Sequence, residues 1–352
     1  MSMLADQVDV VIGVDTHKHT HSAAVVVAGT GAVVAQATVT ADPDGYLALF
    51  DLAEAHGSLR AWSIEGTGGY GAGLTRFLQE AGELVVELDR PKRVHRRGGE
   101  KSDPLDAVRA AREALGRDQL AQPRARGERA ALSVLLAARR SAVDGATIAQ
   151  RQIHALVIAA PEELRAKFRS KSTLQMVDRA ARMRVDERWD VETRSTAAVL
   201  RRLAKRSRAL AEEAREHEAD ILAIVRTWRP DLLEPVGVGP IVAATVLCAW
   251  SHPGRCRNEG AFAKLGGVAP IPASSGMTVR YRLNPYGDRQ LNRALHTVVV
   301  TRMRFDPATK AYAEARTKEG KTPKEIKRCL KRYVARQLFR QLENPPVALD
   351  NP

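Results

Sequence analysis

The sequence predicts an α/β domain at the N-terminus, a helical middle region with coiled-coil character and a mostly α-helical C-terminal domain. Apolar, β-branched runs alternate with amphipathic stretches up to Asp89, which is the pattern of a half-buried sheet with helices. A segment rich in Ala, Arg, Glu and Leu follows, and glycine and proline become frequent again from Arg229. A chain of 352 residues has room for several domains. We place them at residues 8–120, 125–228 and 229–342, with a tail at 343–352.

The order of elements in the N-terminal domain predicts its fold. Expected strands cover residues 8–15, 22–28, 31–40, 60–65 and 83–89, and expected helices cover residues 42–56 and 70–81. A further helix carries Asp103 and Asp106. The order β-β-β-α-β-α-β-α is that of an RNase H-like fold, which places one carboxylate on the first strand, one on the fourth strand and the rest on the last helix.

The remaining chain is expected to be mostly helical. The spacing of Leu200, Leu203 and Leu210 favours a coiled-coil-like pair of long helices that serves in dimerisation or in spacing the domains, although a helical bundle without an oligomeric role fits equally well. Pro235-Val-Gly-Val-Gly-Pro240 resembles a helix-hairpin-helix element, whose glycine turn lets backbone N–H groups approach a phosphate. A last amphipathic helix is expected over residues 324–340.

Charge is distributed unevenly along the chain. The formal net charge is +14, yet residues 1–60 contain two Lys or Arg against seven Asp or Glu, so the positive excess lies after residue 60. Such an excess indicates a polyanionic partner such as nucleic acid. Because no apolar run approaches the roughly 18 residues of a membrane-spanning helix and no signal peptide is recognisable, we expect a cytoplasmic protein that does not bind membranes.

Four acidic residues stand out in this basic chain: Asp15, Glu65, Asp103 and Asp106. The first two each end an expected strand, and the last two share one face of the expected helix. Hard cations such as Mg²⁺ (or Mn²⁺) take oxygen ligands, and ions held by shared carboxylates can stabilise the attacking and leaving oxygens at phosphorus. We therefore predict a metal-dependent phosphodiester site. Asp103 has a second interpretation, since Pro104 after it makes it a natural helix N-cap.

Basic residues near these sites are candidates for nucleic-acid binding. One run directly precedes the aspartates, where a solvated loop is the alternative, and others lie in the C-terminal domain: Lys92, Arg93, Arg96, Arg97, Lys101, Arg280, Arg282, Lys327 and Lys331. The pair Ser274-Ser275 precedes Gly276, which usually indicates only a turn. A serine near a metal-bound phosphate can also serve as a covalent nucleophile. The residues by themselves leave the two interpretations open.

Three histidines, His17, His19 and His21, alternate after Asp15. In a strand such residues share a face that points to solvent or substrate. Because no cysteine or fourth ligand accompanies them, we do not expect a zinc site.

Several motifs together resemble the DEDD transposases of bacterial insertion sequences, the IS110 family. They are Val-Ile-Gly-Val-Asp15-Thr-His-Lys18, Glu65-Gly-Thr-Gly-Gly-Tyr70, Lys101-Ser-Asp103-Pro-Leu-Asp106-Ala, Gly-Val-Gly-Pro240, Leu265-Gly-Gly-Val-Ala-Pro270 with Ser275-Gly276, and Phe305-Asp-Pro-Ala-Thr. The resemblance covers residues 10–342 and implies a RuvC-like domain, a coiled coil for assembly and a C-terminal transposase domain with a serine. In the family a serine often follows the glutamate, where this chain has Gly66.

The resemblance also implies a mechanism and partners. Asp15, Glu65, Asp103 and Asp106 would bind Mg²⁺ or Mn²⁺, and Ser275, with Ser274 as the alternative, would attack DNA to give a covalent phosphoserine linkage. A structured non-coding bridge RNA would pair with target and donor DNA. The metal site of one subunit would work with the serine of another in a homo-oligomer, a dimer or a tetramer, in association with the bacterial nucleoid.

Three other classes of protein fit part of the pattern. A RuvC-like Holliday-junction resolvase or an RNase H-type nuclease would keep the fold but hydrolyse with water. An actin-like ATPase or sugar kinase also ends its first strand in an aspartate, but it needs small residues beside the phosphates, where this chain has the bulky run Thr16-His17-Lys18-His19. An architectural DNA-binding protein would have no use for the carboxylates.

Overall fold

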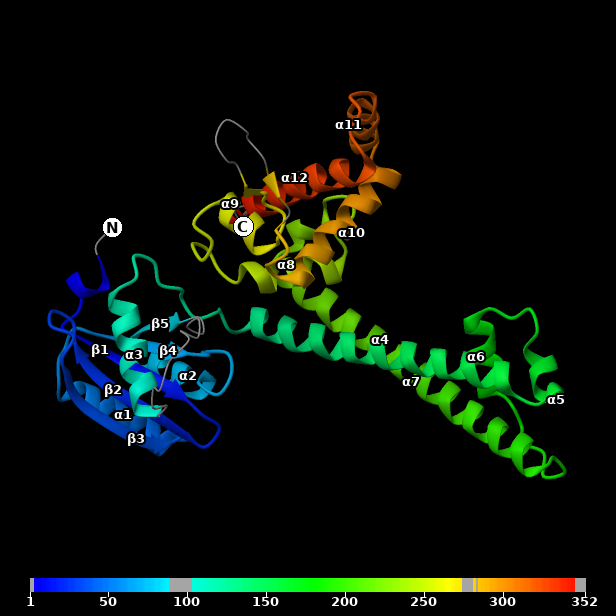
Figure 1. Ribbon diagram of the computed structural model, residues 1–352, viewed down its shortest axis with the longest axis horizontal. Helices are drawn as coiled ribbons and strands as arrows, with labels where there is room; N and C mark the ends of the chain where they lie inside the picture. The colour runs from blue at the N-terminus through cyan, green and yellow to red at the C-terminus, as the bar shows by residue number, and fades with distance from the viewer. Residues whose placement is uncertain (1–2, 89–102, 274–280, 283, 346–352) are drawn as a thin grey trace, which may run out of the picture. The chain divides into compact units, whose positions relative to one another are not determined.

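The computed structural model describes residues 3–88, 103–273, 281–282 and 284–345 (Figure 1). The chain divides between Ala125 and Arg126 into two compact units. The four candidate metal ligands belong to the first unit, and the candidate serines belong to the segment of chain that forms the second.

The first unit is built on a five-stranded sheet with the strand order β3-β2-β1-β4-β5. Its strands are β1 (Val10–Thr16), β2 (Thr20–Val27), β3 (Val33–Thr40), β4 (Arg60–Glu65) and β5 (Leu84–Leu88). Strand β1 pairs antiparallel with β2 and parallel with β4, and β4 pairs parallel with β5. The five expected strands are confirmed with small differences at their ends, and this mixed sheet is compatible with the predicted RNase H-like fold.

Helices cover both faces of this sheet (Figure 1). They are α1 (Pro43–Glu54), α2 (Ala72–Glu80) and α3 (Asp103–Leu115), and a short 3₁₀ turn, η1 (Leu4–Asp6), precedes β1. Successive side chains of a strand point to opposite faces. On β1, Ile12 and Val14 pack into the core with α1 and α2, whereas Val11 packs into the core with α3. The same alternation assigns Asp15 to the face that α3 covers.

Gly13 allows α3 to lie directly on β1. A Cβ atom at this position would come within 2.0 Å of the carbonyl oxygen of Ala107 and 2.5 Å of the amide nitrogen of Ala111. Both neighbours are backbone atoms of α3, which cannot move aside as the end of a flexible side chain can. The missing side chain therefore brings the first turn of α3, with Asp103 and Asp106, close to the end of β1.

Substituting Gly13 with alanine is expected to destabilise the first unit by about 2 to 3 kcal/mol, because the new methyl group must push α3 away from the sheet. Urea unfolding followed by hydrogen–deuterium exchange of the β1 and α3 amides measures this change. Gly29→Ala is the matched control, since a Cβ there meets nothing within 4 Å. Equal stability of the two variants would contradict the close-contact argument.

Two long helices form an extended arm in the second unit (Figure 1). They are α4 (Glu128–Ala159) and α7 (Val191–Trp228), and the chain between them forms α5 (Glu162–Arg165), η2 (Ala166–Phe168) and α6 (Thr173–Ala181). The two long helices approach closely at Gly145, where a Cβ would lie 3.0 Å from Cδ1 of Leu210. Long helices in this region are confirmed. Their coiled-coil role in assembly stays a prediction.

A helical core lies at the base of the arm. It is formed by α8 (Pro240–Trp250), α9 (Glu259–Leu265), α10 (Arg289–Phe305), α11 (Pro307–Lys318) and α12 (Pro323–Glu343), with η3 (Pro230–Leu233) before α8 and the two-stranded sheet of β6 (Ile271–Pro272) and β7 (Tyr281–Arg282). Leu132 of α4 and Val225 of α7 are fully buried in this same core. The mostly helical C-terminal part is thus confirmed. The domain boundary at residue 229 stays a prediction.

The glycine turn before α8 packs against a neighbouring helix. Gly237 has a φ of +86°, and a Cβ there would lie 3.1 Å from the carbonyl oxygen of Val298 on α10. Gly239 is the N-cap residue of α8 and has open space around its Cα. The helix-hairpin-helix assignment stays a prediction.

The exposed side of the longest helix, α7, carries many charged residues. Among the helices in the described parts of the chain, none combines the length and the apolar character needed to cross a membrane.

Candidate metal centre

Two of the predicted ligands lie at the ends of neighbouring strands. β1 and β4 are parallel, and their last paired residues are Val14 and Ile64. Asp15 and Glu65 therefore follow at the same edge of the sheet. Since Val14 and Ile64 both pack into the core on the opposite face, Asp15 and Glu65 share the face that α3 covers. The hydroxyl of Thr16 donates a hydrogen bond of 2.9 Å to the carbonyl oxygen of Glu65 and ties the two strand ends together.

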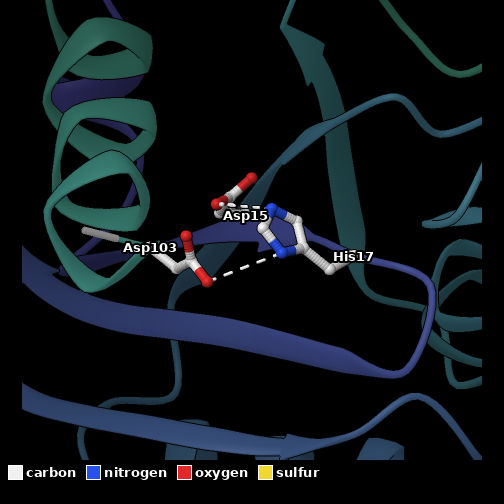
Figure 2. Close-up of side chains that lie close together, drawn as sticks. All are labelled: Asp15, His17 and Asp103. Carbon is white, nitrogen blue, oxygen red and sulfur yellow. Dashed lines mark ion pairs between the residues drawn. The ribbon is translucent and has the colours of Figure 1, made fainter. Parts of the chain in front are cut away.

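Helix α3 brings a third carboxylate to this edge (Figure 2). Nε2 of His17 lies 3.5 Å from Oδ2 of Asp15, and Nδ1 of the same ring lies 3.5 Å from Oδ2 of Asp103. One ligand atom from each of these three residues falls within 4.8 Å of the others. The side chain of Asp15 is 15% exposed and that of Asp103 is 47% exposed, so the cluster opens to solvent and to a substrate.

The other two predicted ligands lie outside this compact cluster. Asp106 stands three residues along α3, where its Oδ1 accepts a hydrogen bond of 2.5 Å from the guanidinium of Arg109. Glu65 lies on the neighbouring strand. The role of the four carboxylates as a ligand set stays a prediction, and the structure brings Asp15 and Asp103 together.

Asp103 is the first residue of α3 and does not precede the helix. Its carboxylate and that of Asp106 both lie in the first turn, where the positive end of the helix dipole favours negative charge. The interpretation of Asp103 as a helix cap stays a prediction.

The chemistry of the cluster fits a divalent cation. Carboxylate oxygens are the ligands that Mg²⁺ and Mn²⁺ prefer. The imidazole of His17 can add a nitrogen ligand, or it can hold the two carboxylates apart by hydrogen bonding.

The expectation that the three histidines share one strand face is wrong. His17 and His19 lie in the connection between β1 and β2, where the amide of His17 donates to the carbonyl of Thr20 at 3.0 Å. His21 is fully buried on β2 and stacks on Tyr46 with ring centroids 5.8 Å apart. Burial lowers the pKa of His21 below its usual value, although the carbonyl of Thr20 opposes this shift.

Sequence reasoning missed His17 as a member of the cluster. The signal that could have found it is the tight return of the chain after Asp15, because a residue two positions beyond the end of a strand can turn back toward that strand's edge. Treating the histidines as alternating along a strand overlooked the turn that the expected strand limits, residues 15 and 22, already imply.

Several predicted nucleic-acid contacts and both serines lie outside the described residues: Lys92, Arg93, Arg96, Arg97, Lys101, Ser274, Ser275 and Arg280. The serines fall between β6 and β7, which pair antiparallel with Ile271 opposite Arg282. Arg282 itself is exposed on β7.

The predicted contacts on α12 belong to a concentrated cationic surface. Nζ of Lys331 donates a hydrogen bond of 3.1 Å to Asn292 on α10. Burial lowers the pKa of Lys331, and the neighbouring charges of Arg289 and Arg328 lower it further. Burial likewise lowers the pKa of His296, with added repulsion from Lys331 and Lys327. Repulsion between these neighbouring cations thus adds to the effect of burial, and a role of Lys327 and Lys331 in nucleic-acid binding stays a prediction.

Comparisons with known proteins match two segments of the chain. A sequence model of the DEDD transposases of the IS110 type, described as a transposase, matches residues 12–160 and includes all four carboxylates. The model of the transposase IS116/IS110/IS902 family matches residues 231–314 and includes the serine pair.

A curated relative is similar over part of its length. An uncharacterised 43.6 kDa protein of insertion element IS110 from Streptomyces coelicolor is 30% identical over 145 residues. These residues cover 40% of this chain and 36% of that protein. The chain therefore matches about a third of the length of this relative.

Proposed function

This chain belongs to the IS110 family of DEDD transposases, and on that premise we propose that it cuts and rejoins DNA strands as the transposase of a mobile element. The observation that supports this most is the meeting of Asp15 and Asp103 at one edge of the sheet, where their oxygens lie beside His17. Two carboxylates far apart in the sequence come together on a sheet whose topology is compatible with an RNase H-like fold.

In this proposal Asp15 and Asp103, with Glu65 and Asp106 nearby, hold Mg²⁺ or Mn²⁺. When bound, such a cation polarises a phosphoryl oxygen and stabilises the negative charge that develops on it. The carboxylates fix the position of the cation at the open edge of the sheet. The basic residues of the chain bind the DNA backbone by attracting its phosphates.

The strand-cutting step uses a serine, Ser275 or its neighbour Ser274. Its Oγ attacks phosphorus and forms a phosphoserine ester, while the bond to one sugar oxygen breaks and that oxygen takes up a proton. One phosphodiester replaces another, so rejoining by a second sugar hydroxyl needs no external energy source. A catalytic base for the serine is not evident in its own motif, which agrees with a site completed by the carboxylates of another subunit.

A bridge RNA and a homo-oligomer complete the proposal. If base pairing selects target and donor DNA, the protein needs few side chains that read bases. The positive charge after residue 60 then serves RNA and DNA backbones alike.

Incubating the protein with labelled DNA and Mg²⁺ should yield joined strands and a protein–DNA adduct that survives denaturing electrophoresis. EDTA should remove both products, and added Mn²⁺ should restore them, because carboxylate ligands accept either ion. Cleaved DNA without joined strands or adduct would instead indicate a hydrolytic nuclease.

A second arm of the same assay tests the bridge RNA. RNA that co-purifies with the protein is sequenced and compared with the DNA flanking its gene, and the assay is repeated after nuclease treatment and repurification. We expect activity to require the RNA. Full activity of RNA-free protein would remove the guided mechanism and leave the transposase assignment in place.

A further inference from the structure

The far end of the arm carries a concave, positively charged pocket that is separate from the sites described so far. It has a volume of about 1040 Å³, opens widely to solvent and is lined by residues of η2, α6 and the connections on both sides of α6. Six of its lining residues are basic: Lys167, Lys171, Arg179, Arg182, Arg184 and Arg188. Three acidic residues, Asp178, Asp186 and Glu187, also line it, so positive charge is in excess.

Four of the six cations are available to a ligand. Arg188 binds Asp186 at 2.8 Å, and hydrogen bonds from Arg188 lower the pKa of that carboxyl to about 2. Lys167 lies 4.4 Å from the ring centre of Trp189. The others form no ion pair with any residue in the described ranges of the chain: Lys171, Arg179, Arg182 and Arg184. The uncompensated charge of the pocket thus comes from α6 and its two flanking loops.

A small hydrophobic core fixes this arrangement. Val177 and Ala180 on the inner face of α6 pack against Leu200 and Ala204 of α7. Ser172 caps α6 and forms a capping box with Gln175. Because the inner face is buried, Arg179 and Arg182 are held on the outer face, where both are exposed. The cations are therefore presented by a packed element.

Charge along α7 continues the positive potential of the pocket. The half of α7 nearer the pocket, residues 191–210, contains six Lys or Arg and one acid, whereas residues 211–228 contain two Lys or Arg and five acids. A helix dipole favours acidic side chains at the N-terminus of a helix. The basic N-terminal half and acidic C-terminal half of α7 therefore do not stabilise the helix. Like charges four residues apart, as in Arg201–Lys205 and Arg202–Arg206, repel one another. A polyanion bound at this end of the arm would offset that repulsion.

We propose that the pocket at the far end of the arm, with the basic half of α7, binds the phosphate backbone of duplex DNA. This rests on the proposed function only in that the chain acts on DNA. Duplex DNA is favoured over an RNA loop because looped bases are usually held by stacking on aromatic rings. The indole of Trp189 has Lys167 over its ring, and its Nε1 donates to Glu163 at 2.5 Å. The pocket therefore offers cations to phosphates, whereas the ring face of Trp189 that Lys167 covers is not free to stack on a base.

The arm separates this contact from the cationic surface at its base. Leu200 belongs to the small core at the far end and Val225 to the core at the base. Roughly 25 residues of α7 lie between them, which corresponds to about 37 Å of helix. The second unit would thus hold DNA at two points about one helical turn or more apart.

The test compares two triple variants of the full-length chain. In the pocket variant, Arg179, Arg182 and Arg184 are replaced by Gln. In the control variant, Arg140, Arg215 and Arg226 are replaced by Gln; these are exposed residues of α4 and α7 outside the pocket lining, and the charge change is the same. Binding to a 40-base-pair DNA duplex of arbitrary sequence is measured by fluorescence anisotropy at several salt concentrations. A 40-nucleotide RNA hairpin is measured in parallel.

For the duplex, we expect the pocket variant to reduce the magnitude of the slope of log affinity against log salt concentration by about 2 to 3. Each lost phosphate contact lowers the magnitude of this slope by about 0.9. The control variant should change this slope by less than about 1. A photo-crosslinking amino acid at Gln175, which lines the pocket, should capture the duplex in the otherwise wild-type protein.

Three outcomes would overturn the proposal. Equal slopes for the two variants together with no crosslink would show that the pocket does not bind DNA, while leaving strand transfer intact. A loss confined to the RNA hairpin would assign the pocket to RNA. A change in oligomeric state with unchanged DNA affinity, measured by light scattering, would make it a protein interface. If even the wild-type chain binds no DNA, the proposed function fails as well.

Discussion

Replacing Asp15 by asparagine is expected to reduce DNA strand transfer by more than about 100-fold while the fold is retained. Asparagine keeps the shape of the side chain but removes the charge that would hold a divalent cation. Mutating a group that only orients a metal ligand already lowers metal affinity or activity by about 10- to 100-fold. Removing a ligand itself should therefore lower activity further. The side chain of Asp15 is 15% exposed, and its Oδ2 lies 3.5 Å from Nε2 of His17, the ring that also contacts Asp103. The rate of joined-strand formation at saturating Mg²⁺ measures the effect.

Asp51→Asn is the matched control for this prediction. Asp51 is an exposed residue of α1, the helix that packs into the core on the opposite face of the sheet, so the same chemical change should leave strand transfer within about twofold of wild type. Both variants should unfold at the same urea concentration. Wild-type strand transfer by Asp15→Asn would show that the cluster is not the catalytic metal centre.

Changing both Ser274 and Ser275 to alanine should abolish the covalent protein–DNA adduct and strand transfer, because no hydroxyl remains to attack phosphorus. Denaturing electrophoresis of labelled DNA after incubation with Mg²⁺ detects the adduct directly. The two single variants identify the nucleophile, and we expect Ser275→Ala to have the larger effect. Ser141→Ala with Ser195→Ala is the control, since both residues are exposed on the arm.

The serine and carboxylate variants should differ in metal binding. Mn²⁺ binding, followed by calorimetry, is expected to weaken at least tenfold in Asp15→Asn and to remain unchanged in the double serine variant. Undiminished strand transfer by the double serine variant would remove the covalent mechanism and favour attack by water. This result would leave the metal centre in place, so the two parts of the proposed function can fail separately.

The sheet of the first unit could be predicted because its signals are local. β-branched runs and glycine turns mark each strand, and Asp42 before Pro43 marks the start of α1, where its side chain accepts a hydrogen bond from the amide of Gly45. The order of the elements then restricts the topology, because short connections join neighbouring strands and parallel strands need a helical crossover. The expected strand β4 coincides with the observed one at residues 60–65.

The geometry of the candidate site was only partly predictable. That Asp15 and Glu65 end adjacent strands follows from the fold. The position of His17 depends on the turn after β1. The ion pair between Asp106 and Arg109 depends on the rotamer of Arg109. Neither has a periodic signal in the sequence.

The structure was also needed to show which charged residues of the arm form ion pairs. Residues 167–188 contain seven Lys or Arg and three Asp or Glu but no recognisable motif, so nothing distinguishes them from other basic stretches of this basic sequence. Folding pairs Arg188 with Asp186 and turns Arg179 and Arg182 outward into a pocket. Only the folded arm shows which charges remain without an opposite partner there.

By itself the sequence determined the α/β class of the first unit, the helical character of the second, the four acidic candidates and the family of the chain, because these depend on residue order, local periodicity and motif. The tertiary structure decided which side chains meet. Gly13 lets α3 approach β1, which places Asp103 within reach of Asp15 and His17. The packing of α6 on α7 buries Val177 and Ala180 and leaves Arg179 and Arg182 exposed in the pocket lining. Such contacts join residues distant in the chain, so no local pattern specifies them.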